Sequence, residues 1–425
     1  MAGRHRRSSN LKFATRQRRR VPVRLLAFVA VLIVVVVAVI LVLAETSPVP
    51  ALTVRRALPA SVRFPGAPPA PAWPRGGEAA AEVQGLGSLG TSGPQKPVPI
   101  ASVTKIMTAY VVLQDHPVKV GQGGFQVTVS AADVADYKRR LAAGELVARV
   151  TAGETINEVQ LLQALLVASA NNVAPILADF DAGSVPAFIA RMNAEAHRLG
   201  MTHTTYAGVS GISPATVSTA ADQLKLAAAA MADPVFARTV AMTSATVPVA
   251  GVLANFNRAI GTGGYVGIKA GSDPTAGGCL VFANRQTVGG HPVTILGVVL
   301  GQAPGHASTA LLTAAAQSAA DGIVHSVTAS LHRATVLPAG AVVATVSNRQ
   351  GASAPARTSS AVQAVGWGGL DIPVDVTLLP VGRSAGAGTP AARVSVASGS
   401  PATTTAGTAA PVPAVSFSWR VAHVF

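Results

Sequence analysis

The longest apolar stretch of the chain lies near its N-terminus. The 20 residues from Leu25 to Ala44 contain no polar side chain, and at 1.5 Å per residue they span about 30 Å, the thickness of a bilayer's hydrocarbon core. Basic residues before this stretch and Glu45 after it predict a cytoplasmic tail at 1–22 and a transmembrane helix at 23–44, with the rest of the chain outside the cytoplasm. The alternative is a cleaved signal peptide, because "VLA" ahead of the glutamate has small residues at suitable positions.

The rest of the chain divides into segments with different patterns. Residues 45–77, rich in proline and alanine, show neither helical nor alternating periodicity and are expected to form a stiff spacer. In residues 78–325, strand-like runs at both ends enclose longer helical runs, which predicts an α+β domain whose sheet is built from both ends of the segment. The expected strands are 79–86, 277–285 and 292–301, and the expected helices are 100–114, 157–168, 186–199, 219–232 and 307–324. Residues 326–425 read as short β-type stretches to the last residue, and predict a separate small β domain.

Charge and cysteine content narrow the class of protein. The formal net charge is +15, from 33 basic and 18 acidic residues, but nine of the basic residues lie within residues 1–24, which contain no acid. Because the excess of positive charge is local, we do not expect nucleic-acid binding. The single cysteine, Cys279, excludes an intrachain disulfide and is expected to be a small buried apolar side chain.

One helical run carries candidate chemistry. In "PIASVTKIMTAYVVLQ", residues 99–114, Ser102 and Lys105 lie three positions apart, a spacing that makes side chains neighbours on a helix. A lysine can take the proton of a serine hydroxyl only if burial or a nearby cation lowers its pKa from about 10.4. The run is otherwise apolar, which favours burial of this lysine over a surface position. Pro99 is expected to place the serine in the first turn of the helix, where free backbone N–H groups favour a developing anion.

Two further segments place polar residues in apolar surroundings. In "LLVASANNVAPIL", Ser169 and Asn171 lie at a break between two helical runs, and enclosed polar groups need partners. The alternative here is that Asn171 or Asn172 merely caps the second helix. In "GYVGIKAGSD", Lys269 and Gly271 lie on an expected strand, where glycine allows a ligand to approach the backbone closely.

These patterns resemble those of a known family. Taken in order, Ser-x-x-Lys at 102, Ser-x-Asn at 169 and Lys-x-Gly at 269 resemble the three motifs of the penicillin-recognising serine hydrolases. The finer resemblance is to the D-alanyl-D-alanine carboxypeptidases, the low-molecular-mass penicillin-binding proteins. It covers about residues 78–300 and is carried by "PIASVTKIMTA", "LLVASANNVA", "MNAEAHRLGMTHTTYAGVSGIS", "STAADQL" and "KAGSDPTAGGCLVFA". The resemblance implies a β-lactamase-like fold, with an antiparallel sheet covered by helices.

The resemblance also implies a role for each matching residue. The catalytic residues would be Ser102, Lys105 and Ser169, and the substrate-binding residues Asn171, Lys269, Gly271 and Ser272. The first serine would be the acylated nucleophile, the lysine beside it the general base, and Ser169 a proton relay to the leaving amine. Asn171 would bind the substrate's amide and Lys269 its terminal carboxylate. The backbone N–H groups of Ser102 and Ser272 would form the oxyanion hole. No cofactor and no metal are implied.

One position departs from the family pattern. The third motif normally reads Lys-Thr-Gly or Lys-Ser-Gly, and this chain has Ala270 in the middle. The missing hydroxyl would bind the substrate carboxylate, an interaction worth roughly 1.5–3 kcal/mol, or about 10- to 150-fold in rate. A catalytically impaired protein that still binds muropeptides or penicillin is therefore an alternative. A β-lactamase is disfavoured, because the only glutamate between Ser169 and Lys269 is Glu195.

Three other polar residues are assigned no catalytic role. Asp222 is expected to be the capping-box partner of Thr219. His197 and His203 lack further ligands at metal-binding spacing, so a metal site is not expected.

We therefore predict a serine D-alanyl-D-alanine carboxypeptidase that acts through an acyl-enzyme on Ser102. Residues 23–44 would anchor it in the cell membrane, with the N-terminus in the cytoplasm and the catalytic domain outside. The stem peptides of peptidoglycan would be its substrates, and β-lactam antibiotics would be acylating inhibitors. Whether the enzyme also cleaves cross-links as an endopeptidase, and what the β domain contacts, stay open.

Overall fold

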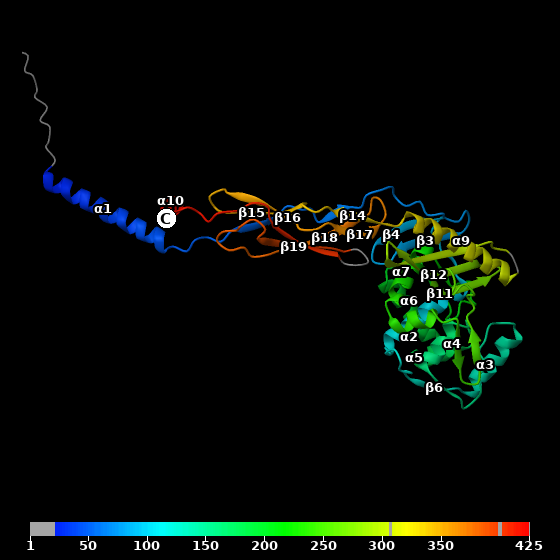
Figure 1. Ribbon diagram of the computed structural model, residues 1–425. Helices are drawn as coiled ribbons and strands as arrows, with labels where there is room; N and C mark the ends of the chain where they lie inside the picture. The colour runs from blue at the N-terminus through cyan, green and yellow to red at the C-terminus, as the bar shows by residue number, and fades with distance from the viewer. Residues whose placement is uncertain (1–21, 306–307, 398–401, 425) are drawn as a thin grey trace, which may run out of the picture.

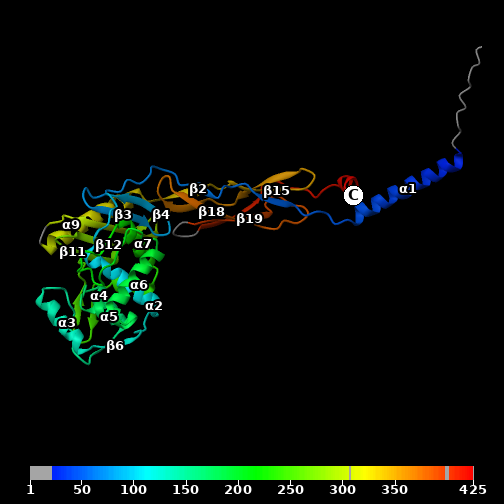
Figure 2. The ribbon, with the colours of Figure 1, turned by 180° about the vertical axis from the view of Figure 1, so that it is seen from behind.

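The computed structural model describes residues 22–305, 308–397 and 402–424. Figure 1 shows three parts in a row: a long helix α1 (Val23–Thr46), an elongated β-sheet region, and a domain of helices and sheet at the far end. Figure 2 shows the same row from behind. Helix α1 is long and apolar enough to cross a bilayer. The predicted cytoplasmic tail, residues 1–22, lies outside the described residues except for its last one.

The helix-and-sheet domain, residues 78–330, is built on a five-stranded antiparallel sheet with the strand order β11-β12-β13-β3-β4. Its strands are β3 (Glu78–Val83), β4 (Gly87–Ser92), β11 (Tyr265–Asp273), β12 (Gly277–Val288) and β13 (His291–Gln302). Strand β3 pairs with β13, so the two ends of the segment meet in one sheet. The predicted α+β class is confirmed. Strand β11 lies at the edge of the sheet, where half of its backbone groups have no strand partner.

Helices cover both faces of this sheet. Helix α9 (Thr309–Ser330) packs on one face against Leu280 and Phe282. The opposite face, which includes Val281, packs on α7 (Ala220–Met231) and the other helices. Successive residues of β12 thus enter two different cores, as the alternation of side chains along a strand requires.

The remaining elements, mostly helices, lie on the face of the sheet opposite α9. They are the 3-10 turn η1 (Ala101–Thr104), the helices α2 (Lys105–Asp115), α3 (Ala131–Ala142), α4 (Glu158–Leu166), α5 (Val173–Ala182), α6 (Val185–Arg198) and α8 (Pro234–Val240), and the strand pairs β5 (Val98–Pro99) with β8 (Val217–Ser218), β6 (Gln126–Thr128) with β7 (Thr155–Asn157), and β9 (Ser244–Val247) with β10 (Gly251–Ala254). Capping boxes start two of these helices, Ser130 with Asp133 for α3 and Asn157 with Gln160 for α4. Each of the predicted helical runs corresponds to an observed helix.

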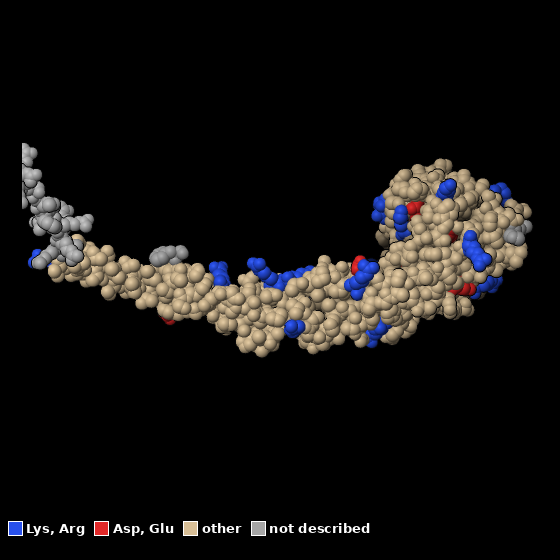
Figure 3. All heavy atoms as spheres, turned by 90° about the horizontal axis from the view of Figure 1, so that it is seen from above, with Lys and Arg blue, Asp and Glu red and all other residues tan. Residues whose placement is uncertain are grey.

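The elongated β region is a seven-stranded sheet with the order β1-β15-β16-β20-β19-β18-β2 and a separate β14-β17 pair. Its strands are β1 (Thr53–Arg56), β2 (Ser61–Arg63), β14 (His332–Leu337), β15 (Val342–Ser347), β16 (Ser353–Thr358), β17 (Val362–Gly366), β18 (Asp371–Leu378), β19 (Pro390–Val396) and β20 (Ala402–Thr408). Basic side chains are spread along the face of this region that Figure 3 presents, rather than gathered into one patch.

Two features of this region differ from the sequence-based prediction. Strands β1 and β2 come from residues 45–77, the predicted spacer, and pair with β15 and β18 at the two edges of the sheet. Edge strands tolerate neighbouring prolines, because one side of the strand needs no hydrogen bonds. The predicted boundary at residues 325 and 326 also falls inside α9, which continues to Ser330.

Near the end of the described chain, a predicted β-type stretch forms a helix. Helix α10 (Phe417–Ala422) begins after Ser416, whose hydroxyl accepts a hydrogen bond from the N–H of Trp419. It packs on the end of α1, where Arg420 Nη1 donates to the carbonyl of Ala44 at 2.9 Å. Figure 1 shows α10 beside the end of α1.

Candidate active site

The first predicted site residue, Ser102, lies in the 3-10 turn η1 and not in the first turn of an α-helix. Helix α2 begins only at Lys105. Ala101, just before the serine, has a left-handed backbone with φ +45°. Gly211, at φ +86°, lies directly against its carbonyl, where a Cβ atom would overlap the oxygen. A distant segment therefore fixes the backbone conformation of this turn.

Lys105 is fully buried, and its amine has three polar neighbours. Its Nζ lies 2.9 Å from Ser102 Oγ, 2.7 Å from Asn171 Oδ1 and 2.8 Å from the carbonyl oxygen of Ser210. The amide oxygen and the carbonyl oxygen can only accept hydrogen bonds. A neutral amine donates one hydrogen to each of them and presents its lone pair to the third neighbour, the serine hydroxyl. The arrangement therefore suits a lysine that acts as a base.

Electrostatics favour this neutral state. Burial lowers the pKa of Lys105 well below its usual range, and the nearby cations of Lys269 and Arg140 lower it further. Glu145 acts in the opposite direction and raises the pKa of the same amine. The net shift is downward, because the cost of burying a charged amine is the largest contribution.

The break between α4 and α5 holds the second motif. Ser169 is fully buried in a left-handed backbone conformation, φ +59°, and its hydroxyl has no hydrogen-bond partner among the described residues. Such strain costs on the order of 1–3 kcal/mol and is found mostly at functional sites. Asn172 occupies the N-cap position of α5, but its side chain makes no capping hydrogen bond and pairs instead with both the N–H and the carbonyl of Ala148. The side chain of Asn171 is used by Lys105. The alternative that one of these side chains merely caps the second helix is therefore wrong.

Asn171 connects the lysine to an ion pair. While its Oδ1 accepts from Lys105, its Nδ2 donates to Glu145 Oε2 at 2.9 Å. The same carboxylate oxygen accepts from Arg140 Nη1 at 2.9 Å. Arg140 also donates through Nε to Asp136, one turn earlier on α3, at 2.6 Å. A chain of hydrogen bonds thus runs from α3 to Ser102.

The third motif lies on the edge strand β11. Lys269 and Gly271 face the same side as Ser102, and a Cβ atom on Gly271 would lie 2.8 Å from the Ser102 nitrogen. The amine of Lys269 is buried, donates to the carbonyl of Ala270 at 2.9 Å and lies 5.3 Å from the ring centre of Phe256. Burial lowers the pKa of this lysine to about 7. Ser272 follows on the same strand and is partly exposed.

Ala270 points to the other face of the sheet. It is buried in the core that α9 forms with the sheet. It also lines a cavity of about 270 Å³, together with Phe256, Asn257, Arg258 and side chains of α9. The Nδ2 of Asn257 is buried without a hydrogen-bond partner in the described part of the chain. There is thus room, beside an unused donor, for the hydroxyl that the motif lacks.

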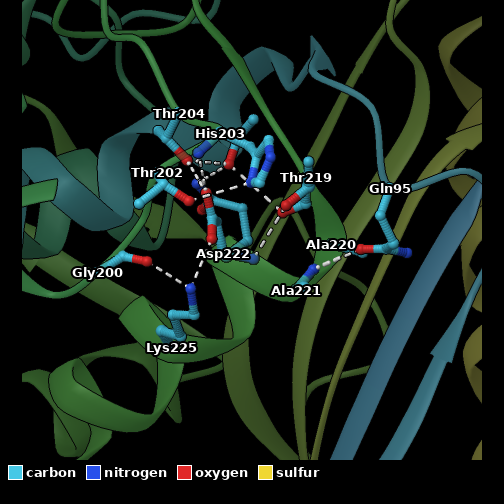
Figure 4. Close-up of polar contacts among 12 residues, drawn as sticks. Gln95, Gly200, Thr202, His203, Thr204, Thr219, Ala220, Ala221, Asp222 and Lys225 are labelled. Atoms are coloured by element: carbon cyan, nitrogen blue, oxygen red, sulfur yellow. Dashed lines mark hydrogen bonds and ion pairs between the residues drawn. The ribbon is translucent and has the colours of Figure 1, made fainter. Parts of the chain in front are cut away.

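Asp222 lies outside this constellation. The hydroxyl of Thr219 accepts from its backbone N–H at 3.2 Å, as predicted, but its carboxylate does not complete a capping box. Instead it accepts from the N–H of His203 at 2.8 Å and from Thr204 Oγ1 at 3.0 Å, and pairs with Lys225 at 2.9 Å (Figure 4). Asp222 therefore links α7 to the loop before it through hydrogen bonds, which is a structural role.

The structure joins Ser102, Lys105 and Asn171 by hydrogen bonds and places Gly271 of β11 against the same turn. It also adds two contacts that the sequence did not single out. These are the carboxylate of Glu145 and the carbonyl of Ser210. The contact with the Ser210 carbonyl cannot be predicted from residue types, because every residue has a backbone carbonyl. The "GE" dipeptide at 144–145 follows α3, and without the fold nothing links it to Asn171, 26 positions later.

Comparison with known proteins gives consistent results. Residues 89–303 match the D-alanyl-D-alanine carboxypeptidase family. The chain is 32% identical over 212 residues to a D-alanyl-D-alanine endopeptidase of Pseudomonas aeruginosa, covering 48% of this chain and 64% of that protein. It is 34% identical over 216 residues to a D-alanyl-D-alanine carboxypeptidase of a Streptomyces species, covering 47% of this chain and 71% of that one.

One solved structure shares the fold over a larger part of the chain than these relatives match. The D-alanyl-D-alanine carboxypeptidase DacD from Francisella tularensis superposes with a TM-score of 0.53 at 18% identity, over 82% of this chain and 96% of that one. The superposition reaches beyond the helix-and-sheet domain into the β region.

Proposed function

Because the chain belongs to the D-alanyl-D-alanine carboxypeptidase family, we propose that it is a serine carboxypeptidase that removes the terminal D-alanine from peptidoglycan stem peptides. One observation carries this proposal. The buried amine of Lys105 lies 2.9 Å from Ser102 Oγ, with two obligatory acceptors at its other positions. A serine hydroxyl beside a neutral lysine is a nucleophile with its base.

The reaction has two steps. Ser102 Oγ attacks the carbonyl carbon between the two D-alanines while Lys105 takes the hydroxyl proton. The C–N bond then breaks, and the proton passes through Ser169 to the leaving amine, so that D-alanine departs and an ester remains on the serine. Water hydrolyses the ester and restores the free hydroxyl. The hydroxyl of Ser169 supports the relay role, since it has no hydrogen-bond partner within the described part of the chain and can bond the leaving nitrogen.

The groups around Ser102 and Lys105 bind the substrate. Asn171 Nδ2 has a second hydrogen for the carbonyl of the peptide, because Glu145 takes only one. Lys269 attracts the terminal carboxylate, and its charge helps to keep Lys105 neutral. The N–H groups of Ser102 and Ser272 form the oxyanion hole, while Gly271 leaves the space between the turn and β11 open.

We further propose that α1 anchors the enzyme in the cell membrane, with the N-terminus in the cytoplasm and the helix-and-sheet domain outside. The apolar length of α1 and the basic residues ahead of it in the sequence support this topology. The β region then holds the active site at a distance from the lipid. β-Lactam antibiotics are expected to acylate the same serine.

Three alternatives give different products. An endopeptidase, the activity named for the Pseudomonas relative, would cleave cross-linked dimers. An impaired binding protein would form an adduct without releasing D-alanine, because Ala270 offers no hydroxyl to the carboxylate. A β-lactamase would release its penicilloyl adduct rapidly. Glu195 does not favour this last activity, since it is paired with Arg198 on α6.

The test is intact-mass spectrometry of the full chain in detergent with benzylpenicillin, beside Ser102→Ala, and release of D-alanine from a diacyl-D-Ala-D-Ala peptide. We expect a lasting adduct that is absent from the variant, together with D-alanine release. An adduct on Ser102→Ala would refute the assignment of the nucleophile. An adduct without peptide turnover would favour the binding protein.

A further inference from the structure

The Arg140–Glu145 ion pair is joined to the active site by one side chain. Asn171 donates to Glu145 through Nδ2 and accepts from Lys105 through Oδ1. Both members of the ion pair are largely buried, with side chains 15% and 16% exposed. None of the three predicted motifs contains either residue.

We propose that Glu145 is a positioning residue that orients the amide of Asn171 and, through it, sets the protonation of Lys105 and hence the pH range in which Ser102 is acylated. The inference rests on the proposed function and adds a residue to it. Glu145 is not assigned a contact with the substrate.

Glu145 determines the orientation of the Asn171 amide. An asparagine side chain can be turned end for end, which exchanges its donor and its acceptor. An ionised carboxylate only accepts, so Glu145 favours the orientation in which Nδ2 faces it. The oxygen must then face Lys105, where it accepts from the amine. Without Glu145, the opposite orientation would bring an N–H donor against the amine and would disturb its alignment with Ser102.

Glu145 also contributes a negative charge near Lys105. Lys105 is surrounded by Lys269 on β11, Arg140 on α3 and Glu145, while its direct neighbours Ser102, Asn171 and Ser210 are neutral. The two cations favour the neutral amine and the carboxylate favours the charged one. Removal of the carboxylate therefore leaves two cations as the charged groups that act on the amine, and Arg140 keeps only its ion pair with Asp136.

The experiment measures the rate of acylation by benzylpenicillin against pH, for the full chain and for three variants. Glu145→Gln keeps an acceptor oxygen for Asn171 but removes the charge. In the plot of acylation rate against pH, the rate falls at low pH as Lys105 becomes protonated, and we call this fall the acid limb. For Glu145→Gln we expect the acid limb to lie lower by about half a pH unit or more, with a similar maximum rate on the plateau. Glu145→Leu removes the acceptor as well, and we expect its plateau to fall about tenfold or more. Glu195→Gln is the matched control, since it removes a carboxylate paired with an arginine on α6, and its profile should equal that of the wild type.

The outcomes separate the two proposals. An adduct on the wild type with an unchanged acid limb in Glu145→Gln would overturn this inference alone. A purely structural role for Glu145 would lower the yield of folded protein in both variants but would leave the acid limb of the folded fraction in place. The absence of any adduct on the wild type would overturn the proposed function and this inference with it.

Discussion

Replacement of Gly271 by alanine tests the closest approach in the proposed active site. The glycine lies on β11 opposite the turn that carries Ser102. An added Cβ would lie 2.8 Å from the Ser102 nitrogen, 3.1 Å from the Val103 nitrogen and 3.3 Å from the Ala101 side chain. All of these atoms belong to η1, so the methyl group would press on the turn that holds the nucleophile.

The size of the effect follows from these distances. Ordinary contact begins at 3.4 Å, so β11 and η1 must separate by about 0.6 Å to admit the methyl group. A displacement of about 1 Å at a reacting group can cost about 10²-fold in rate, and loss of an oxyanion-hole donor costs about 10²- to 10³-fold. We therefore expect Gly271→Ala to lower the rate of acylation about 10²-fold, equivalent to about 2.7 kcal/mol. Overpacking is expected to lower the free energy of unfolding by about 1–3 kcal/mol.

The assay is the rate of adduct formation with benzylpenicillin, with thermal unfolding measured on the same samples. Gly76→Ala is the control, because a Cβ there meets no atom within 4 Å and its backbone suits any residue. The control should acylate at the wild-type rate. A wild-type rate for Gly271→Ala would refute the reasoning, since the free space between β11 and the turn would then be of no consequence for the reaction.

Three other predictions concern different parts of the domain. Ala270→Thr has room in the adjoining cavity of about 270 Å³, so it should fold normally, but its hydroxyl would enter the core beside α9 on the face away from Ser102, so kcat/KM for a D-Ala-D-Ala peptide should stay unchanged; a rise of about tenfold or more would mean that a hydroxyl at this position reaches the substrate carboxylate. The pKa of Lys269 lies at about 7, and its attraction for a carboxylate is present below this pH and lost above it. Hence kcat/KM should fall as the pH rises through about 7, whereas kcat should fall less, because bound carboxylate keeps the amine charged; parallel profiles of the two would contradict this assignment. Asp222→Ala leaves the half-buried N–H of His203 without its acceptor and removes one of the two partners of the Thr204 hydroxyl, which keeps Ser218, and it should lower the free energy of unfolding by about 1–3 kcal/mol, measured by urea denaturation. Acylation per folded molecule should stay unchanged in this variant, and a specific loss of acylation would show that Asp222 takes part in the reaction.

The local part of the candidate site could be predicted from the sequence. Ser102 and Lys105 are three positions apart in an apolar run, and both the contact and the burial of the lysine follow from that pattern. The backbone conformation of the turn η1 could not be predicted, because it depends on Gly211, a residue from a distant segment that packs against the Ala101 carbonyl. The hydrogen bond between Glu145 and Asn171 joins two loops that have no periodic pattern, so neither periodicity nor spacing predicts it.

The β region was the harder part to predict. Strands β1 and β2 are short and lie among prolines, and they exist as strands because β15 and β18 offer them edges far along the chain. A window of local sequence contains no information about such partners. The C-terminal stretch alternates like a strand, yet Ser416 caps it as a helix and α1 gives it a surface to pack on. In both segments the distant partner decides the secondary structure.

The pairing of β1 and β2 with the C-terminal strands makes the helix-and-sheet domain an insertion within the β region. The chain enters that domain after β2 and returns through β14, so two covalent connections join the parts where a simple tandem arrangement would have one. Two connections resist swivelling and bending better than a single tether does. With the proposed membrane anchor and substrate, the β region and the helix-and-sheet domain would move as one unit, and the enzyme would trim only those stem peptides that this unit can reach from the lipid.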